Sequence, residues 1–163
     1  MRPVRAYIGI GSNLGDPVQQ VRDVLPNLNC IRDCSLLASS SLYRSEAVSD
    51  IRQDDFINAV ACVQTSLSPT QLLLELQAIE HAFYRQRDPE QKWGPRTMDL
   101  DILLFGQQQL KDSHLTIPHP QMQNRLFVLQ PLHEIAGDLY IPRLGSLSYL
   151  IDNAPQMRIQ RLR

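Results

Sequence analysis

The stretch Lys92-Trp-Gly-Pro-Arg-Thr-Met-Asp-Leu-Asp-Ile-Leu-Leu-Phe105 joins a polar loop to an apolar strand. Alternation with a period of two residues predicts the strand over 99–105, because successive side chains of a strand point to opposite faces. The pattern places Leu100, Ile102 and Leu104 on one face, and on the other face Asp99, Asp101, Leu103 and Phe105. Two carboxylates therefore leave the same face, about 7 Å apart along the backbone.

We expect a positively charged group between Asp99 and Asp101, because two unpaired carboxylates side by side repel each other. A divalent cation meets this need, since Mg²⁺ binds one or two carboxylates together with substrate phosphates. Just upstream, Pro95 stiffens the loop that carries Arg96, whose planar donor group suits phosphate oxygens. Trp93 adds a flat apolar face. The stretch predicts a magnesium and phosphate site; the alternative is that the two aspartates form a solvated strand edge or a pair of turn caps.

Composition and charge are those of a single globular domain. The chain has 163 residues, of which 43% are hydrophobic and 20% charged, and this length can bury one core. A net charge of -1 argues against a nucleic-acid surface, and no apolar run approaches the ~20 residues of a membrane span. We expect one domain over 1–163, monomeric and cytoplasmic. Three cysteines without a Cys-x-x-Cys pattern argue against disulfides and zinc.

The first strand is predicted over 6–10, and glycines at 9, 11 and 15 punctuate the turn after it. A strand followed by such glycines and a helix has the form of a dinucleotide-binding fingerprint. The chain is too short for two mononucleotide-binding halves, however, and its later segments do not alternate strand with helix. These two features argue against a dinucleotide fold.

Caps and periodicity predict the remaining elements. Asp16 and Pro17 begin a helix that Pro26 is expected to kink or end early. Ser68 and Gln71 form a capping box at the start of a second helix. The other predicted elements are strands over 34–43, 56–65 and 115–117, the second helix to about Tyr84, a helical region over 122–136 broken at Pro131, a short strand ending at Pro142 and a helix over 147–151.

The order strand, helix, strand, strand, helix, strand, followed by a C-terminal appendage, predicts an α+β fold of the ferredoxin-like β-α-β-β-α-β type. The connections are too short to make every strand parallel, so an antiparallel sheet with helices on one face is favoured. No glycine is followed by lysine, so ATP would be held without a P-loop. The arginine-rich tail over 157–163 indicates no chemistry.

Three motifs resemble one enzyme family. They are Trp-Gly-Pro-Arg-Thr-Met-Asp-Leu-Asp-Ile at 93–102, Gly-Ser-Asn-Leu-Gly at 11–15 and Ile-Pro-His-Pro at 117–120. Their order and spacing resemble 6-hydroxymethyl-7,8-dihydropterin pyrophosphokinases of the folate pathway, from about Tyr7 to about Tyr140. The resemblance implies the same ferredoxin-like fold. It also implies two substrates, ATP and 6-hydroxymethyl-7,8-dihydropterin, with pyrophosphate transferred to the pterin hydroxyl and AMP released.

The resemblance further implies roles for individual residues. Asp99 and Asp101 would hold two Mg²⁺ ions, and they would form the catalytic set together with Arg85 and Arg96. The implied pterin contacts are Gly11, Ser45, Val48, Phe56, Asn58, Trp93 and Phe127. The implied ATP contacts are Gln77, Glu80, Arg85, Arg87, Trp93, Arg96, Ile102, Thr116, His119 and Arg125.

Some positions depart from the family pattern and leave alternatives open. Glu46-Ala47 stands where the family usually has Pro-Pro, and Asp88 stands where a lysine is common. A degenerate homologue that binds ATP or pterin without transferring pyrophosphate is one alternative. Another is an RNA-binding module, which requires a basic surface and several aromatics on central strands; here Phe56 alone is available. Asn58 has its own alternative, an amide bonded to neighbouring backbone.

Overall fold

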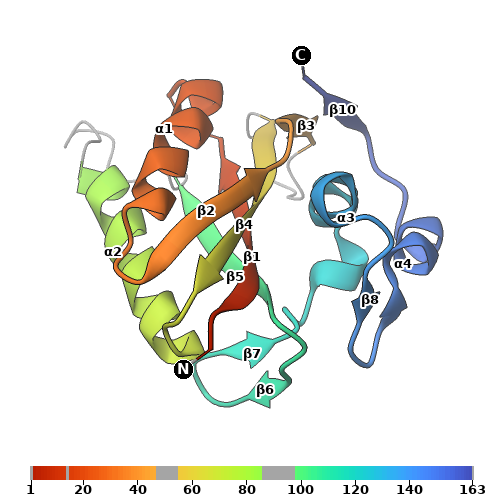
Figure 1. The fold of residues 1–163 in the computed structure, drawn as a ribbon. Coiled ribbons are helices and arrows are strands. Elements are labelled where there is room, and N and C mark those ends of the chain that lie inside the picture. The colour runs from red at the N-terminus through yellow and green to blue at the C-terminus, as the bar shows by residue number, and fades with distance from the viewer. Residues whose placement is uncertain (1, 14, 47–54, 86–97, 163) are drawn as a thin grey trace.

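The computed structural model of the protein describes residues 2–13, 15–46, 55–85 and 98–162, apart from the side chain of Arg85. Within these ranges, six strands form one central antiparallel sheet (Figure 1). Its strands are β1 (Val4–Ser12), β2 (Cys34–Ser39), β3 (Tyr43–Ser45), β4 (Phe56–Thr65), β5 (Asp99–Phe105) and β10 (Ile159–Arg161). Two small sheets pair β6 (Leu110–Lys111) with β7 (Thr116–Ile117) and β8 (Tyr140–Ile141) with β9 (Gly145–Ser146).

The strand order confirms the predicted fold class. The sheet runs β10-β3-β4-β1-β5, and β2 also pairs with β4. β1 therefore lies between β4 and β5, as in a split β-α-β arrangement. The predicted strand over 34–43 is two strands, because Ser40 interrupts it: the Ser40 hydroxyl oxygen accepts a hydrogen bond from the backbone N–H of Val60 at 2.9 Å.

Helices cover both faces of the sheet (Figure 1). The helices are α1 (Pro17–Asn29), α2 (Pro69–Arg85), α3 (Leu126–Ala136) and α4 (Leu147–Asn153), with the short 3-10 helix η2 (Met122–Asn124) before α3. One buried cluster joins α1 and α2 to one face, and a second cluster joins α3 and α4 to the other. The predicted C-terminal appendage is thus a second layer, since it covers the face that α1 and α2 leave open.

The alternation predicted for β5 holds only for its first part. The register with β1 skips Leu103, so the strand contains a bulge of one residue. An extra residue switches the side chains after it to the opposite face. Leu104 therefore packs with the second layer and Phe105 with α1 and α2, the reverse of the prediction. Asp99 and Asp101 precede the bulge, and they both line the pocket on the second-layer side of the sheet.

Two prolines do not end helices as predicted. α1 continues through Pro26 to Asn29, and α3 is unbroken at Pro131. Each proline removes one helical hydrogen bond. Burial of apolar side chains near each proline offsets this loss, and the buried residues are Val24 and Leu28 in α1 and Leu129 and Leu132 in α3.

Both predicted helix starts are confirmed. The Asp16 carboxylate accepts a hydrogen bond from the backbone N–H of Gln19 at 3.2 Å. At the start of α2, the Ser68 hydroxyl accepts from the backbone N–H of Gln71 at 3.2 Å, and the Gln71 side-chain oxygen accepts from the backbone N–H of Ser68 at 2.9 Å. These reciprocal bonds are those of a capping box.

The carboxylate of Glu134 ties α3 to the sheet and to the C-terminal strand. Its Oε2 accepts hydrogen bonds from the backbone N–H of Ser41 at 2.8 Å and from the Ser41 hydroxyl at 3.1 Å. Its Oε1 accepts from the Tyr43 hydroxyl at 2.5 Å, and Arg161 Nη2 lies 3.7 Å from Oε2. Burial alone would raise the pKa of Glu134, but the hydrogen bonds from Tyr43 and Ser41 lower it overall. Burial and the bond to Glu134 raise the pKa of Tyr43 to about 12.

Replacing Glu134 with glutamine is expected to lower the free energy of unfolding by about 2 kcal/mol at pH 7, because charge-assisted hydrogen bonds are lost. The side chain is 22% exposed, so solvent screens these bonds only in part. Folding lowers the pKa of Glu134 from its ordinary 4.5, so this stabilisation is present above pH 4.5 and fades as the pH falls further. Urea unfolding at pH 7 and pH 3 measures it. An equal difference between the two proteins at both pH values would contradict the assignment.

Candidate active site

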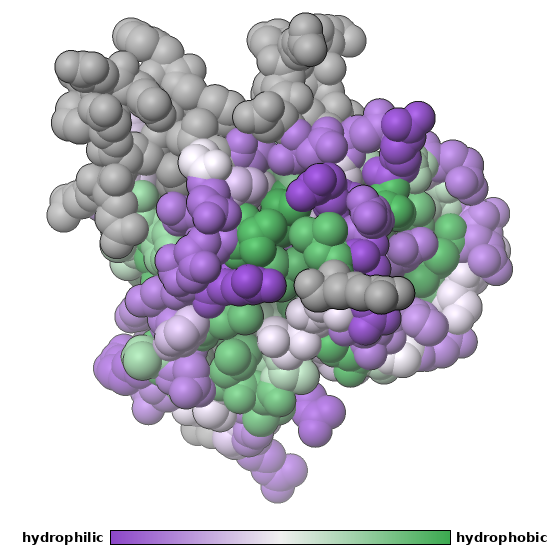
Figure 2. All heavy atoms as spheres, turned by 90° about the horizontal axis from the view of Figure 1, so that it is seen from above, coloured by the Kyte–Doolittle hydropathy of each residue, from purple (hydrophilic) through white to green (hydrophobic). Residues whose placement is uncertain are grey.

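A pocket of about 640 Å³ lies between the sheet and the second layer. It opens at the end of the sheet where β1 finishes and β5 begins, since Gly11 pairs with Asp99 there. Figure 2 views the molecule from above Figure 1 and shows apolar residues gathered in the middle of this face, with hydrophilic residues around them. The lining comes from β1, β3, β4 and β5, from the start of α3 and from the segment before β10.

Two glycines of β1 form the floor of the pocket. Gly11 lies opposite Asn58 on β4 and opposite Asp99 on β5, and Gly9 lies opposite Asp101. A Cβ atom on Gly11 would lie only 3.3 Å from Asn58 Oδ1. Gly11 therefore leaves space between the Asn58 amide on β4 and the Asp99 carboxylate on β5. These two strands are two strand spacings, or about 10 Å, apart.

One side of the pocket combines a fixed amide with aromatic walls. Asn58 is 4% exposed, and its Nδ2 donates to the Ser45 hydroxyl oxygen at 2.6 Å. The expected alternative, an amide bonded to neighbouring backbone, is not the contact seen here. Phe56 pairs with Ser45 across the sheet, and Phe127 approaches from α3. Five of the predicted pterin contacts, namely Gly11, Ser45, Phe56, Asn58 and Phe127, therefore line one pocket.

The other side of the pocket is acidic. Asp99 and Asp101 both line it, and Asp101 Oδ2 lies 4.0 Å from Nε2 of His119. The Nδ1 of His119 accepts a hydrogen bond from the backbone N–H of Gln121 at 3.1 Å, so a neutral ring carries its proton on Nε2, toward Asp101. Burial lowers the pKa of His119; the charge of Asp101 opposes this shift, and the charge of Arg125 adds to it.

Arg125 connects the aromatic and acidic sides. It lines the pocket just before α3, and its guanidinium carbon lies 5.9 Å from the ring centroid of Phe127. A guanidinium over an aromatic ring is held by a cation-π interaction and still presents donors to an anion. Arg125 is thus the arginine that the described part of the pocket offers to a phosphate.

Five predicted ATP contacts with described side chains lie outside the lining of this pocket. One of them is His119, which lies beside Asp101. Glu80 on α2 accepts a hydrogen bond from the backbone N–H of Leu100 at 2.8 Å, which fixes the start of β5. Gln77 is exposed on the same helix, and Thr116 is half-buried in β7. Ile102 is 2% exposed in the cluster on the α1 and α2 side, so its side chain points away from the pocket.

The remaining predicted site residues lie outside the described part of the chain. They are Val48, Arg87, Trp93 and Arg96, together with the side chain of Arg85, which ends α2. Lys92 and the departures at Ala47 and Asp88 fall in the same segments.

Several lining residues were not predicted. Alternation along the strand does indicate Gly9, because residues two apart share a face and Gly9 therefore lies on the face of Gly11. No local pattern indicates the other residues, since only the tertiary fold brings them to the pocket. They are Gln121 and Asn124 before α3, and Pro155, Gln156 and Met157 before β10. The tail, for which the sequence indicated no chemistry, therefore borders the pocket.

The two carboxylates suit magnesium better than a closed metal site. In the part of the chain that the structure describes, no group of three His, Cys, Asp or Glu side chains is arranged to hold a metal ion. A structural zinc site needs such a set. Mg²⁺ instead takes one or two carboxylates and completes its shell with water and substrate phosphates. Asp99 and Asp101, which both line the pocket, match that requirement.

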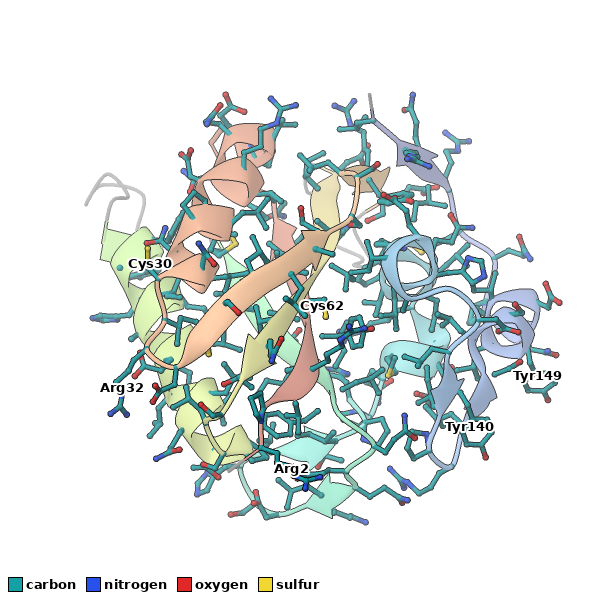
Figure 3. The ribbon with its side chains drawn as sticks, in the orientation of Figure 1. Arg2, Cys30, Arg32, Cys62, Tyr140 and Tyr149 are labelled. Atoms are coloured by element: carbon teal, nitrogen blue, oxygen red, sulfur yellow. The ribbon has the colours of Figure 1, made fainter. Side chains whose placement is uncertain are left out.

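Other features of the fold lie away from the pocket. Cys30, Cys34 and Cys62 are free thiols, and Figure 3 shows Cys30 and Cys62 on separate elements. The exposed rings of Tyr140 and Tyr149 lie on the outer side of the second layer (Figure 3). Among the described helices, none has both the length and the apolar character needed to cross a membrane.

Residues 7–137 match the sequence model of the family described as 7,8-dihydro-6-hydroxymethylpterin-pyrophosphokinase (HPPK). The 2-amino-4-hydroxy-6-hydroxymethyldihydropteridine pyrophosphokinase of Haemophilus influenzae is 44% identical over 91% of this chain and 91% of its own length. The enzyme of the same name from Pseudomonas aeruginosa is also 44% identical, over 97% of this chain and 96% of its own.

A solved structure of Plasmodium falciparum HPPK-DHPS with pterin and p-hydroxybenzoate superimposes with a TM-score of 0.70 and 14% identity, over 93% of this chain. The chain spans 43% of that protein, and at this identity the likeness establishes the fold. The sequence relatives carry the assignment further, because they match along nearly their whole length. The chain belongs to the 7,8-dihydro-6-hydroxymethylpterin-pyrophosphokinase family and is a pyrophosphokinase of folate biosynthesis.

Proposed function

We propose that the pocket binds 6-hydroxymethyl-7,8-dihydropterin on its Asn58 side and ATP on its aspartate side. The observation that carries this proposal is the position of Gly11, which lies opposite Asn58 on one neighbouring strand and opposite Asp99 on the other. A substrate hydroxymethyl group above Gly11 would lie between the ring-binding amide and the carboxylates. Pyrophosphate transfer requires the pterin hydroxyl and the phosphates of ATP to lie next to each other.

The pterin ring would be recognised by the amide of Asn58. One N–H of this amide already donates to Ser45, which fixes its orientation. The remaining N–H and the carbonyl oxygen present a donor and an acceptor together, as the amide edge of a pterin requires. Phe56 and Phe127 would contact the faces of the ring, because aromatic side chains stack on flat heteroaromatic groups.

Asp99 and Asp101 would hold the two Mg²⁺ ions that accompany ATP. When bound, magnesium offsets the charge of the phosphates and favours ionisation of a hydroxyl in its shell. The described contacts suggest how the chain prepares these carboxylates. Glu80 holds the backbone of β5 at Leu100, between the two aspartates. His119 stands 4.0 Å from Asp101 and orients its proton toward it.

In the proposed reaction the pterin hydroxyl oxygen forms a bond to the β-phosphorus of ATP. The bond from that phosphorus to the bridging oxygen of AMP breaks, AMP leaves, and the hydroxyl proton passes to solvent. Arg125, with Arg85 and Arg96, would offset charge on the phosphoryl oxygens. Phe127, with Trp93, would exclude water and so limit ATP hydrolysis. We assign no separate general base, because positioning and charge neutralisation supply most of the rate in phosphoryl transfer.

The direct test is AMP release from purified protein with ATP, Mg²⁺ and the pterin alcohol. AMP is expected to form only when all three are present. Binding of ATP or pterin without AMP formation would contradict the proposed reaction and would favour the degenerate homologue. Mass spectrometry of the pterin product should show the added diphosphate, which separates transfer from ATP hydrolysis.

Asp101→Asn is expected to lower AMP release by about 100-fold or more, because a neutral amide binds Mg²⁺ more weakly than a carboxylate. The melting temperature should stay close to that of the parent protein, since the Asp101 side chain is 48% exposed. Asp152→Asn on α4 is the control: that residue is exposed and lies outside this pocket, so its turnover should be unchanged. Normal turnover in Asp101→Asn would remove Asp101 from the site.

Gly11→Ala is expected to raise the KM for the pterin about tenfold, equivalent to about 1.4 kcal/mol. Its added Cβ would lie 3.3 Å from Asn58 Oδ1 and would occupy the floor beneath the ring. The KM for ATP serves as the internal control and should change less than twofold. If the KM for ATP rose while that for pterin stayed constant, the two sides of the pocket would be assigned the wrong way round.

A further inference from the structure

The segment Pro155-Gln156-Met157 forms part of the pocket wall. It lies beyond residue 137, where the match to the sequence model of the family ends.

The segment is held in place at both ends. On its N-terminal side, Ala154 is 7% exposed in the second-layer cluster. On its C-terminal side, β10 pairs with β3, with Ile159 opposite Ser45, and the backbone N–H of Leu162 donates to the carbonyl of Leu42 at 2.8 Å. Because both ends are anchored, Met157 has a fixed position two residues before the partner of Ser45.

Side-chain contacts add to this anchoring. Arg161 Nε donates to the Ser41 hydroxyl oxygen at 3.0 Å, and Arg161 Nη2 lies 3.7 Å from Glu134 on α3. Arg158 Nε lies 3.7 Å from Glu46, but both side chains are largely exposed, so this pair contributes little. The Arg161 contacts therefore fix β10 against the sheet and α3 together.

The strand order decides which substrate the segment faces. β10 and β5 stand at opposite ends of the path β10-β3-β4-β1-β5, four spacings or about 19 Å apart. The carboxylates of Asp99 and Asp101 are on β5, whereas Ser45, the partner of the Asn58 amide, is on β3 next to β10. The wall therefore belongs to the side of the pocket that takes the ring, away from the phosphates.

We propose that Met157 is a substrate-binding residue that contacts the pterin ring and limits the width of its pocket. This inference rests on the proposed function, since it deepens the assignment of the same site. Met157 is half-buried, packs against the second-layer cluster and still lines the pocket. A thioether is flexible and polarisable and makes favourable contacts with aromatic rings. It would complete the apolar wall to which Phe127 also contributes.

The test compares Met157→Ala, Met157→Leu and Ile159→Ala in steady-state AMP release. Met157→Ala is expected to raise the KM for pterin about tenfold, with kcat and the KM for ATP within twofold of the parent values. Met157→Leu keeps the volume and should restore the KM to within about twofold. Ile159→Ala is the matched control: Ile159 is half-buried, packs against the same cluster and lies on the same tail, but it does not line the pocket. Its KM for pterin should stay unchanged.

Three outcomes of this test would contradict either the proposed function or the role of Met157. If the parent protein releases no AMP, the proposed function fails, whatever the variants do. If the parent is active and Met157→Ala leaves the pterin KM unchanged, the inference about Met157 is overturned. A rise of equal size in Ile159→Ala would also overturn it, because the effect would then come from a loosened tail.

A second measurement needs no variant. Oxidation of Met157 by hydrogen peroxide, followed by mass spectrometry, should slow several-fold when the pterin alcohol and a non-hydrolysable ATP analogue are bound. Met122 is fully buried and provides the slow reference within the same sample. An oxidation rate for Met157 that does not respond to the bound pterin would contradict the proposed contact.

Discussion

The antiparallel ladder that holds β1 between β4 and β5 fixes the direction of the polar groups that form the floor and the acidic side of the pocket. A strand side chain changes face when its register shifts by one residue, so the pairing of Gly11 with both Asn58 and Asp99 is a strict constraint. Glycine at the centre of this row keeps the space above the sheet open. The bulge at Leu103 lies beyond both aspartates, so it does not change the face of the sheet from which their side chains project.

The two faces of the sheet are covered in different ways. α1 and α2 bury one face with aliphatic side chains, and the Glu80 carboxylate on α2 also fixes the start of β5. The second layer covers only part of the other face, and the pocket fills the remainder. Glu134 joins this layer to β3 through Tyr43 and to β10 through Arg161. The walls of the pocket are therefore held to its floor by a polar network as well as by apolar packing.

Local signals in the sequence predicted the parts of this structure that depend on local physics. The capping box at Ser68, the strand over 56–65 and the shared face of Asp99 and Asp101 follow from caps and from alternation. The bulge at Leu103 and the approach of Met157 to the pocket depend on pairing between distant strands, which no local pattern contains. Family resemblance supplied the proposed pterin contacts because it transfers positions, but it did not indicate that the Ile102 side chain points into the core on the other face of the sheet.

In the proposed arrangement, a metal bound by the aspartates and a pterin ring bound by Asn58 would lie on either side of Gly11, within two strand spacings or about 10 Å of each other. Mn²⁺ in place of Mg²⁺ makes this distance measurable, because it shortens the NMR relaxation times of nearby protons. With a non-hydrolysable ATP analogue bound, the hydroxymethyl protons of the pterin should relax fastest of all its protons, and Asp101→Asn should abolish the effect. Equal relaxation along the whole pterin, or none, would contradict the arrangement of the two substrates across Gly11.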